Sequence, residues 1–497
     1  MKKSVISTLC AVALGVPAIS VIASDDTGPA LENRTTQSQI TDGSLSLTEI
    51  RRRGMLLFST PFNKADGFGE TPGETPEARR EVGSRGSLQG NGKFTRINGL
   101  DAQACLECHS VISRATIPMK FAVGGVGGVN NTVLGGGGAS FINVNDDENQ
   151  INPPAGGPTE TTGANNINGR TINPPFVFGS GGVELVGNEM TADLQALRQQ
   201  AVDNPNTVVN LVTKGVNFGT LSFDGEDFDT SGVEGIEADA SSDKFLVVQP
   251  FGRTGDNITT RQFDIGAMQF HFGMQPDEVL DPGRAAADDG NAVTDGDGDG
   301  VTNEILIGEL SALNIFSALL ERPRQRRVTS QARRGEQVFN DVGCAECHVP
   351  TLSTTTRKLG VRYPEIANDP SANVYKQLDL SRSPTRFKRN RSGGIDVRLF
   401  ADLKSHDMGP ALAEFNGNQE FTTARLWGVA DTAPYLHDGR AFTLTEAINI
   451  HGQTGSDAET AVANFNGQSS ESQEDLIAFL KTLRTPRVVG RGLRIRR

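Results

Sequence analysis

The sequence contains few of the residues that build large apolar cores. Hydrophobic residues account for 36% of 497 positions, and the chain has one tryptophan and three tyrosines. Glycine and proline are frequent, at 57 and 23 residues. A chain of this length is expected to form at least two cores. Together with the composition, this predicts modest cores separated by long irregular loops.

Positive charge is also scarce, with 47 basic residues against 60 acidic ones and a net charge of -13. Proteins that bind nucleic acids need a basic surface to neutralise phosphates, so this balance argues against a nucleic-acid partner. A basic redox partner agrees better with an acidic surface.

Long hydrophobic runs are absent after the N-terminus. The only long run, residues 5–22, follows two lysines and ends in small residues before an acidic pair. This pattern predicts a signal peptide over residues 1–23, a flexible segment over 24–44, and a protein that is periplasmic or otherwise exported, with no membrane span after cleavage. An uncleaved anchor is the alternative, because the run is just long enough to cross a membrane. A lipoprotein attached through Cys10 agrees less well, because the residues before that cysteine form a poor lipobox.

The chain has five cysteines, and four of them remain once Cys10 leaves with the signal peptide. They form two C-x-x-C-H motifs, at residues 105–109 and 344–348. This is the attachment signature of haem c: two thiols one helical turn apart reach the porphyrin vinyl groups, and the adjacent imidazole binds the iron. The cofactor residues are then Cys105, Cys108, Cys344 and Cys347, with His109 and His348 as proximal iron ligands.

Two other interpretations of the cysteines are a zinc site shared between the motifs and a pair of vicinal disulfide loops. Four thiolates already fill the tetrahedral shell of zinc, which would leave both histidines without a role. Two covalently bound haem c groups account for all six residues.

An internal duplication accompanies the two motifs. The pattern R-R-G-x-x-apolar-F occurs at residues 52–58 and again at 333–339. Helical spacing around each glycine predicts an N-terminal helix of a cytochrome c fold, crossed at the glycine by a terminal helix. For the second copy, the apolar stripe over residues 476–483 is the expected partner.

The first copy carries long insertions. Phe58 precedes Cys105 by 47 residues, whereas Phe339 precedes Cys344 by five, and a glycine-rich stretch follows over 124–169. We interpret that stretch as a surface loop. The predicted fold is therefore mainly α-helical, with two cytochrome c-like domains over residues 45–325 and 326–490, and long irregular insertions in the first.

The segment 433–441, A-P-Y-L-H-D-G-R-A, followed by T-L-T-E-A-I, resembles the C-terminal haem domain of the di-haem cytochrome c peroxidase superfamily. Residues 402–403 and 406–410 resemble its di-haem oxidoreductase branch. The resemblance covers residues 45–485 and is most specific over 330–452. In those peroxidases the distal ligand of the C-terminal haem lies fourteen residues after the motif histidine, which here places His451 at the second haem. Ligation by two histidines would lower the potential of that haem relative to a histidine and methionine pair.

The first haem has two candidate distal ligands, His271 and Met190, although packing on a helix face also explains Met190. Peroxide chemistry needs a carboxylate near the iron to move a proton. The resemblance points to Glu189, with Glu184 as a second candidate, and solvated helix carboxylates are the alternative for both. The peroxidases place a tryptophan between the haems in the N-terminal domain, whereas the one tryptophan here, Trp427, lies in the other half.

Acidic residues alternate with glycine at Asp295, Asp297 and Asp299. The alternation is typical of a calcium loop, but Leu306 stands where an EF-hand needs glutamate. A looser calcium site and an acidic turn are both consistent with it.

From the residues and the resemblance we expect an exported di-haem c-type cytochrome acting in electron transfer. It would reduce hydrogen peroxide at the first haem with electrons that enter through the second from a small redox protein. The alternatives are an electron carrier without peroxidase activity and a haem oxygenase of the rubber-cleaving type. An enzyme that oxidises a partner protein is less consistent with so few tyrosines and tryptophans.

Overall fold

The computed structural model describes residues 28–68, 95–96, 99–100, 104–105, 109, 175–280, 295, 300–413 and 417–486. The predicted signal peptide and the glycine-rich stretch 124–169 lie outside these ranges. The helices are α1 (Gln37–Thr41), α2 (Leu47–Ser59), α4 (Ser180–Asp203), α5 (Thr260–Ala267), α6 (Asp277–Leu280), α7 (Ile307–Ala318), α8 (Ser330–Asp341), α9 (Cys344–Cys347), α10 (Leu444–His451), α11 (Glu459–Asn466) and α12 (Ser470–Leu480). Shorter helical turns are η1 (Lys64–Asp66), η7 (Met268–Phe272), η9 (Pro410–Leu412) and η10 (Val429–Asp431).

The strands are short and form small antiparallel sheets of two or three members. They are β1 (Thr95–Arg96), β2 (Gly99–Leu100), β3 (Val209–Thr213), β4 (Val216–Phe223), β5 (Phe228–Asp229), β6 (Arg324–Gln325), β7 (Leu352–Ser353), β8 (Lys358–Arg362), β9 (Val374–Asp379), β10 (Lys388–Arg389), β11 (Ile395–Val397), β12 (Ser405–Asp407), β13 (Glu420–Thr422) and β14 (Leu483–Arg484). The prediction of a mainly α-helical chain is thus confirmed only in part.

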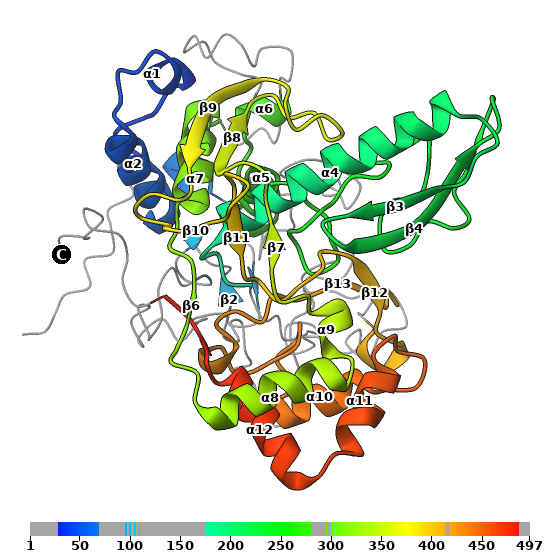
Figure 1. Cartoon of the computed structure of the whole chain (residues 1–497). Coiled ribbons are helices and arrows are strands. Elements are labelled where there is room, and N and C mark those ends of the chain that lie inside the picture. Colours follow the sequence, from blue (N-terminus) through cyan, green and yellow to red (C-terminus); the bar gives the residue numbers. More distant parts are fainter. Residues whose placement is uncertain are drawn as a thin grey trace, which may run out of the picture.

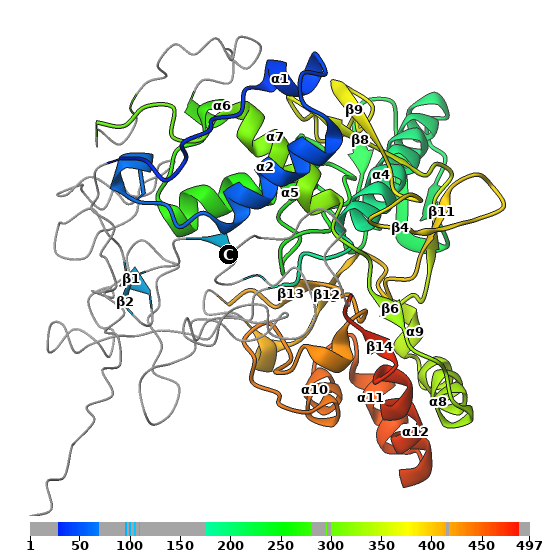
Figure 2. The same cartoon turned by 90° about the vertical axis from the view of Figure 1, so that its left-hand side faces the viewer.

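The first R-R-G copy lies on α2, which packs across α7 (Figures 1 and 2). Ser46 caps this helix by accepting a hydrogen bond from the Glu49 amide. At Gly54 the helices approach so closely that a Cβ would lie 2.1 Å from the Ala312 carbonyl oxygen. One turn further along each helix, the rings of Phe58 and Phe316 pack with centroids 5.5 Å apart.

The second R-R-G copy lies on α8, which packs across α12 at the opposite end of the molecule (Figure 1). A Cβ at Gly335 would lie 1.8 Å from the Asp475 carbonyl oxygen. Four residues later, Phe339 packs against Phe479 with centroids 5.4 Å apart. Both copies therefore combine a glycine crossing with a phenylalanine pair one turn on, which confirms the crossing predicted at each glycine.

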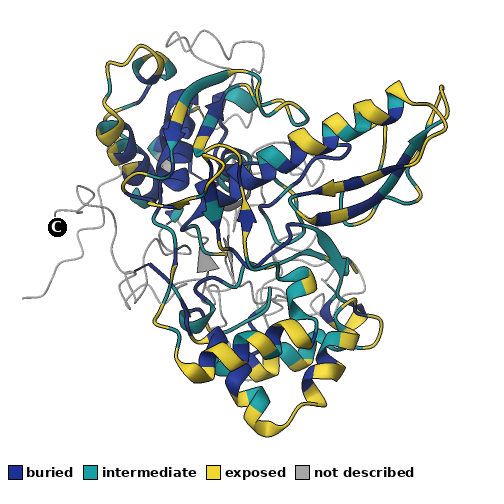
Figure 3. Ribbon diagram, in the orientation of Figure 1, coloured by how far each residue is buried: buried dark blue, intermediate teal, exposed yellow. Residues whose placement is uncertain are grey.

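Buried apolar residues fall into two clusters. The smaller one joins α8, α10, α11 and α12 and includes Phe339, Phe400 and Phe479. The larger one holds α2, α4, α5 and α7 and also takes in residues between Leu352 and Leu403 together with Trp427. Part of the predicted C-terminal domain thus packs on the larger core, and Figure 3 shows buried segments in both regions.

Helix α4 extends away from the body of the molecule, accompanied by the β3–β4 hairpin (Figure 1). Its first turns are buried, and it ends in exposed residues. In the described part of the chain, no helix combines the length and the apolar character that crossing a membrane requires.

Candidate haem sites

The second C-x-x-C-H motif forms a single helical turn, α9, directly after α8. Gly343 begins it with φ of 98°, a backbone conformation that glycine adopts without strain. The His348 amide donates a hydrogen bond to the Cys344 carbonyl oxygen at 3.0 Å, which places both thiols and the imidazole around one turn. Cys344 and Cys347 form no disulfide, and burial raises the pKa of the Cys344 thiol to about 11.

The imidazole of His348 is held by the main chain. Its Nδ1 lies 3.0 Å from the Phe400 carbonyl oxygen. Because that oxygen can only accept, Nδ1 carries the proton and Nε2 keeps its lone pair, the arrangement that an iron-ligating histidine needs. Burial, and repulsion from the nearby His451, lower the pKa of His348 to about 4, so the ring is neutral at physiological pH.

His451 ends helix α10, which Thr443 begins with a capping box to Glu446. Its Nδ1 lies 2.7 Å from the Ala447 carbonyl oxygen one turn earlier, so its Nε2 also keeps a lone pair. Burial lowers the pKa of this imidazole as well. His348, directly after α9, and His451, at the end of α10, therefore lie close enough to interact electrostatically.

The first motif repeats these contacts as far as it is described. The His109 amide donates to the Cys105 carbonyl oxygen at 2.8 Å, which is the same one-turn hydrogen bond as in the second motif. The Nδ1 of His109 lies 2.7 Å from the Pro175 carbonyl oxygen, and its ring packs edge-on against Phe263 at 6.0 Å. Cys108 lies outside the described residues. Both histidines thus present Nε2 as the ligand atom, and the donor sets fit haem c.

A zinc site shared between the motifs is not formed by the described cysteines. The one cluster of metal-ligand side chains in the described part of the chain joins Cys347, Asp402 and His406. It includes no residue of the first motif, and the described cysteines form no vicinal disulfide.

That cluster was not predicted as a site. His406 Nε2 lies 2.8 Å from Asp402, and its Nδ1 lies 3.4 Å from Asp457 and 3.9 Å from the Cys347 sulfur. Burial opposes a charge on this ring, but the hydrogen bonds to Asp402 and Cys347 outweigh it and raise the pKa of His406 to about 10. The sequence offered one signal, since Asp402 and His406 stand four residues apart.

Glu184 lies in the first turn of α4 and is 2% exposed. It accepts hydrogen bonds from the amide and hydroxyl of Thr260 at 3.2 and 3.3 Å, both from the start of α5. Burial, reinforced by repulsion from Glu365, raises the pKa of Glu184 to about 7. This carboxyl therefore changes protonation near neutral pH.

Helix α5 carries Phe263, which contacts the first motif histidine, and then Asp264, which belongs to the same acidic group as Glu184. Burial raises the pKa of Asp264 well above its usual range, and its Oδ2 has no hydrogen-bond partner in the described part of the chain. The nearby Arg261 is 1% exposed and pairs with Glu278. The buried Asp264 thus directly follows Phe263, the residue that contacts His109.

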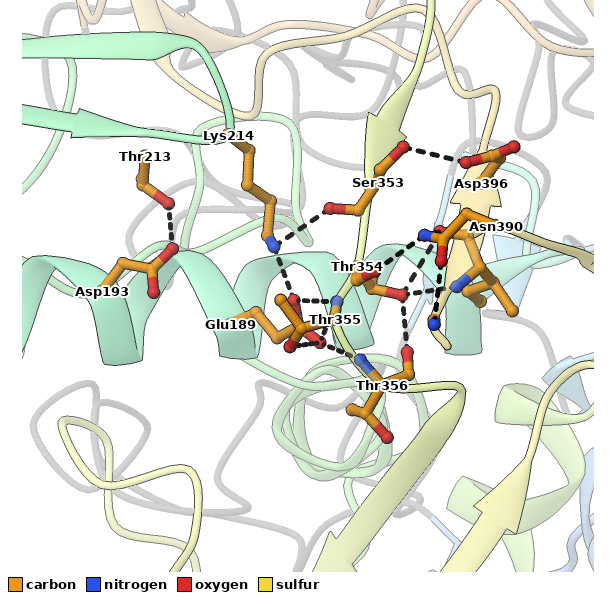
Figure 4. A network of polar contacts seen from close by, with 12 residues as sticks. Glu189, Asp193, Thr213, Lys214, Ser353, Thr354, Thr355, Thr356, Asn390 and Asp396 are labelled. Carbon is orange, nitrogen blue, oxygen red and sulfur yellow. Dashed lines mark hydrogen bonds and ion pairs between the residues drawn. The ribbon is translucent and has the colours of Figure 1, made fainter. Parts of the chain in front are cut away.

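Glu189 is engaged in a different way (Figure 4). Its carboxylate accepts hydrogen bonds from the amides of Thr355 and Thr356 at 2.8 to 3.0 Å, and Lys214 pairs with it at 2.5 Å. These contacts tie α4 to the segment that follows β7 and to the β3–β4 hairpin. They give Glu189 a structural role, and its catalytic role stays a prediction.

The other predicted ligands, for the first haem and for calcium, lie in three separate segments. Met190 is fully buried within the larger apolar cluster, as the packing interpretation expects. His271 lies in η7, and its side chain is outside the described part. Asp295 accepts a hydrogen bond from the Gly300 amide at 3.0 Å, whereas Asp297 and Asp299 are not described, so calcium stays a prediction.

Residues 391–483 match the family described as "Di-haem oxidoreductase, putative peroxidase". The matched range includes His406, the 433–441 motif and His451, all beside the second C-x-x-C-H motif. This match supports a di-haem peroxidase-like relationship for the C-terminal part of the chain. The matched family is described as di-haem, which agrees with the resemblance noted in the sequence.

Similar curated proteins include cytochrome-c peroxidase IdrP1 of Denitromonas iodatirespirans, 26% identical over 31% of this chain and 41% of the relative. Cytochrome-c peroxidase IdrP2 of Pseudomonas sp. (strain SCT) is 29% identical over 31% of this chain and 40% of the relative. The chain thus spans about two fifths of the length of these relatives.

Two solved structures of low similarity were also found. Hydrazine synthase of Kuenenia stuttgartiensis is 21% identical over 36% of this chain and 55% of that one, with a TM-score of 0.21. A MauG-like protein associated with microbial copper homeostasis is 14% identical over 35% of this chain and 52% of that one, with a TM-score of 0.22. With TM-scores this low, neither structure serves as a guide to the fold of this chain.

Proposed function

We propose that this protein is an exported di-haem c-type cytochrome that reduces hydrogen peroxide with electrons from a small redox donor. The observation that carries the proposal is the matched setting of the two motif histidines. The amides of His109 and His348 each donate a hydrogen bond to the carbonyl oxygen of the first cysteine of their motif. The Nδ1–H of each ring donates a hydrogen bond to a main-chain carbonyl oxygen. Two equivalent ligand sets in one chain are what electron transfer between two haems requires.

The two sites are proposed to have different roles. At the second site, His348 follows α9 and His451 ends α10, and both would supply neutral imidazoles. Two such ligands favour a six-coordinate iron that only transfers electrons. At the first site, the buried Glu184 lies at the helix that follows the Pro175 carbonyl, the hydrogen-bond partner of His109. We therefore assign the reactive site to the first haem and electron entry to the second.

Glu184 is the proposed proton carrier. Haem iron, when bound, supplies the electrons that cleave the peroxide bond. Cleavage also requires that a proton leave one peroxide oxygen and reach the other, which a carboxyl can mediate if both of its protonation states are populated. With a pKa of about 7, Glu184 meets that condition, whereas an ordinary exposed glutamate would remain ionised.

The test uses the full exported chain after haem attachment. Haem content is measured first, and an electron paramagnetic resonance spectrum is then recorded on the oxidised protein, after one-electron reduction, and after addition of peroxide. We expect two haems per chain and a high-spin signal that peroxide consumes. Two low-spin signals that peroxide leaves unchanged would contradict the peroxidase and leave an electron carrier. Oxygen uptake with a polyisoprene substrate, without peroxide turnover, would favour the oxygenase instead.

A further inference from the structure

The segment between β13 and η10 carries an arginine without an acidic partner. The Nη1 of Arg425 donates a single hydrogen bond, to the Pro250 carbonyl oxygen at 3.2 Å. Its guanidinium carbon lies 5.6 Å from the Phe176 ring centroid and 5.9 Å from that of Phe251. No carboxylate of the described residues pairs with it, and burial lowers the pKa of Arg425 to about 10.

The lack of a counter-charge distinguishes Arg425 from the buried Arg261. The chain has 60 acidic residues, and Arg261, which is 1% exposed, pairs with Glu278. A guanidinium has five N–H donors, and removing it from water without a counter-charge is costly. The packing against two aromatic rings offsets only part of that cost. An anionic group is therefore expected beside Arg425.

The position of Arg425 indicates which anion this is. The two residues after Arg425 pack in different apolar clusters. Leu426 packs against the smaller cluster, and Trp427 belongs to the larger one. All three contacts of Arg425 are with residues of the N-terminal half. One of them, Phe176, follows Pro175, whose carbonyl oxygen holds the imidazole of His109. The guanidinium is thus beside the segment that orients the first haem ligand.

A second donor in the same region lacks an acceptor. The indole Nε1 of Trp427 is buried with no hydrogen-bond partner in the described part of the chain. Its ring packs so closely on the backbone of Gly179 that a Cβ there would lie 2.9 Å away. Residues 425–427 therefore bring two unmet hydrogen-bond donors to residues 176–179, which indicates that an acceptor group belongs there.

We propose that Arg425, supplied by the C-terminal half, binds a propionate carboxylate of the first haem. This rests on the proposed function, because it requires haem c at the first motif. A haem carries two propionates, and a guanidinium matches a carboxylate in charge and in geometry. A fixed positive charge at this place also favours the reduced iron and makes the seating of the first haem depend on contact between the two halves.

The test compares Arg425→Gln with Arg425→Lys, and with Arg382→Gln as a control that removes the same charge from an exposed side chain. Haem content is measured first, and each couple is then titrated by spectroelectrochemistry. We expect two haems in all variants. In Arg425→Gln, the midpoint potential of the first haem should fall by about 59 mV, which for one electron favours the oxidised form about tenfold. Arg425→Lys should recover most of the shift, and the control should show none.

The outcomes separate the two proposals. Absence of haem from the first motif in the wild type would contradict the proposed function itself. Two haems with unchanged potentials in Arg425→Gln, or a shift of the second couple alone, would overturn the inference. If Arg425→Gln loses the first haem while Arg425→Lys and the control keep it, the contact with the cofactor is supported. The second couple is identified by its shift in His451→Met.

A free carboxylate could present the same chemistry as a propionate. Acetate is therefore titrated into the wild type while the spectrum of the first haem is recorded. A saturable change that disappears in Arg425→Gln would show a site open to external anions and would overturn the propionate assignment. No response to acetate, together with the potential shift, is the expected result.

Discussion

The Cα of Gly335 faces the carbonyl oxygen of Asp475, so closely that a Cβ would lie 1.8 Å from it. Helices α8 and α12 can cross at this distance only because residue 335 has no side chain. Arg334, its neighbour, reinforces the crossing with a two-point ion pair to the Asp475 carboxylate, at 2.6 and 3.0 Å. The same crossing recurs between Gly54 of α2 and Ala312 of α7.

The first prediction concerns these crossings. Gly335→Ala and Gly54→Ala should each lower the free energy of unfolding by about 3 kcal/mol or more, because the added methyl group meets backbone that cannot move without separating the helices. Chemical denaturation monitored by circular dichroism measures the change. Gly266→Ala is the matched control: it is a helical glycine with nothing within 4 Å of its Cβ position. It should raise stability by roughly 0.5–1 kcal/mol, and equal losses in all three variants would contradict the explanation.

The second prediction concerns the ligand from α10. His451→Met should raise the midpoint potential of the second haem, by on the order of 0.1 V, because thioether ligation favours reduced iron. His451→Ala should convert one low-spin signal to high-spin in the electron paramagnetic resonance spectrum. His437→Ala serves as the control, since that ring stacks on Phe421 at 4.7 Å. A low-spin signal that survives in His451→Ala would exclude His451 as the ligand.

The third prediction is a pH dependence. The pKa of Glu184 is raised to about 7, and only its ionised form can accept the peroxide proton. The kcat/KM for peroxide should therefore rise with pH through about 7, and Glu184→Gln should lose about 10²- to 10⁴-fold and remove this limb. An unchanged profile in Glu184→Gln would contradict the assignment.

The fourth prediction is about stability and the same carboxyl. Because the folded-state pKa of Glu184 lies above its ordinary value of 4.5, the folded protein binds the proton more tightly than the unfolded chain does. Its contribution to stability is therefore full below about pH 4.5 and is lost as the pH rises through about 7. Denaturation of wild type and Glu184→Gln between pH 5 and 8 measures this, and the difference between them should grow with pH in favour of the variant.

The fifth prediction separates the two glutamates of α4. Glu189→Gln should lower the free energy of unfolding by about 1–3 kcal/mol, because Lys214 and the Thr355 and Thr356 amides lose a charged acceptor. Peroxide turnover per folded haem should stay within about twofold of wild type. A large loss of turnover at unchanged stability would instead restore Glu189 as the catalytic acid. Glu226→Gln, on the exposed turn after β4, is the control.

Short-range chemistry explains what the sequence could predict. Each C-x-x-C-H motif is complete within five residues, so the local helical turn at Cys344 and the predicted ligand role of its histidine follow from spacing alone. The glycine of each R-R-G pattern predicted a helix crossing, because only a residue without a Cβ permits that approach. The partner of Gly335 could be named from the apolar stripe of α12. The partner of Gly54 could not, since every residue of α7 is buried and the helix lacks a distinguishing apolar stripe.

The tertiary structure decided which side chains the sites bring together. Glu184 and Glu189 stand five residues apart on one helix, and nothing local distinguishes them. Distant segments do. Glu184 is buried near Thr260 and Glu365, whereas Glu189 accepts a hydrogen bond from the Thr355 amide and forms an ion pair with Lys214. The Pro175 and Phe400 carbonyls that orient the two histidines, and the unpaired guanidinium of Arg425, depend equally on long-range packing. The sequence by itself therefore determined the two predicted haem-attachment motifs and the helix crossings. Only the fold decided proton affinity and histidine orientation, because both depend on neighbours that are remote along the chain.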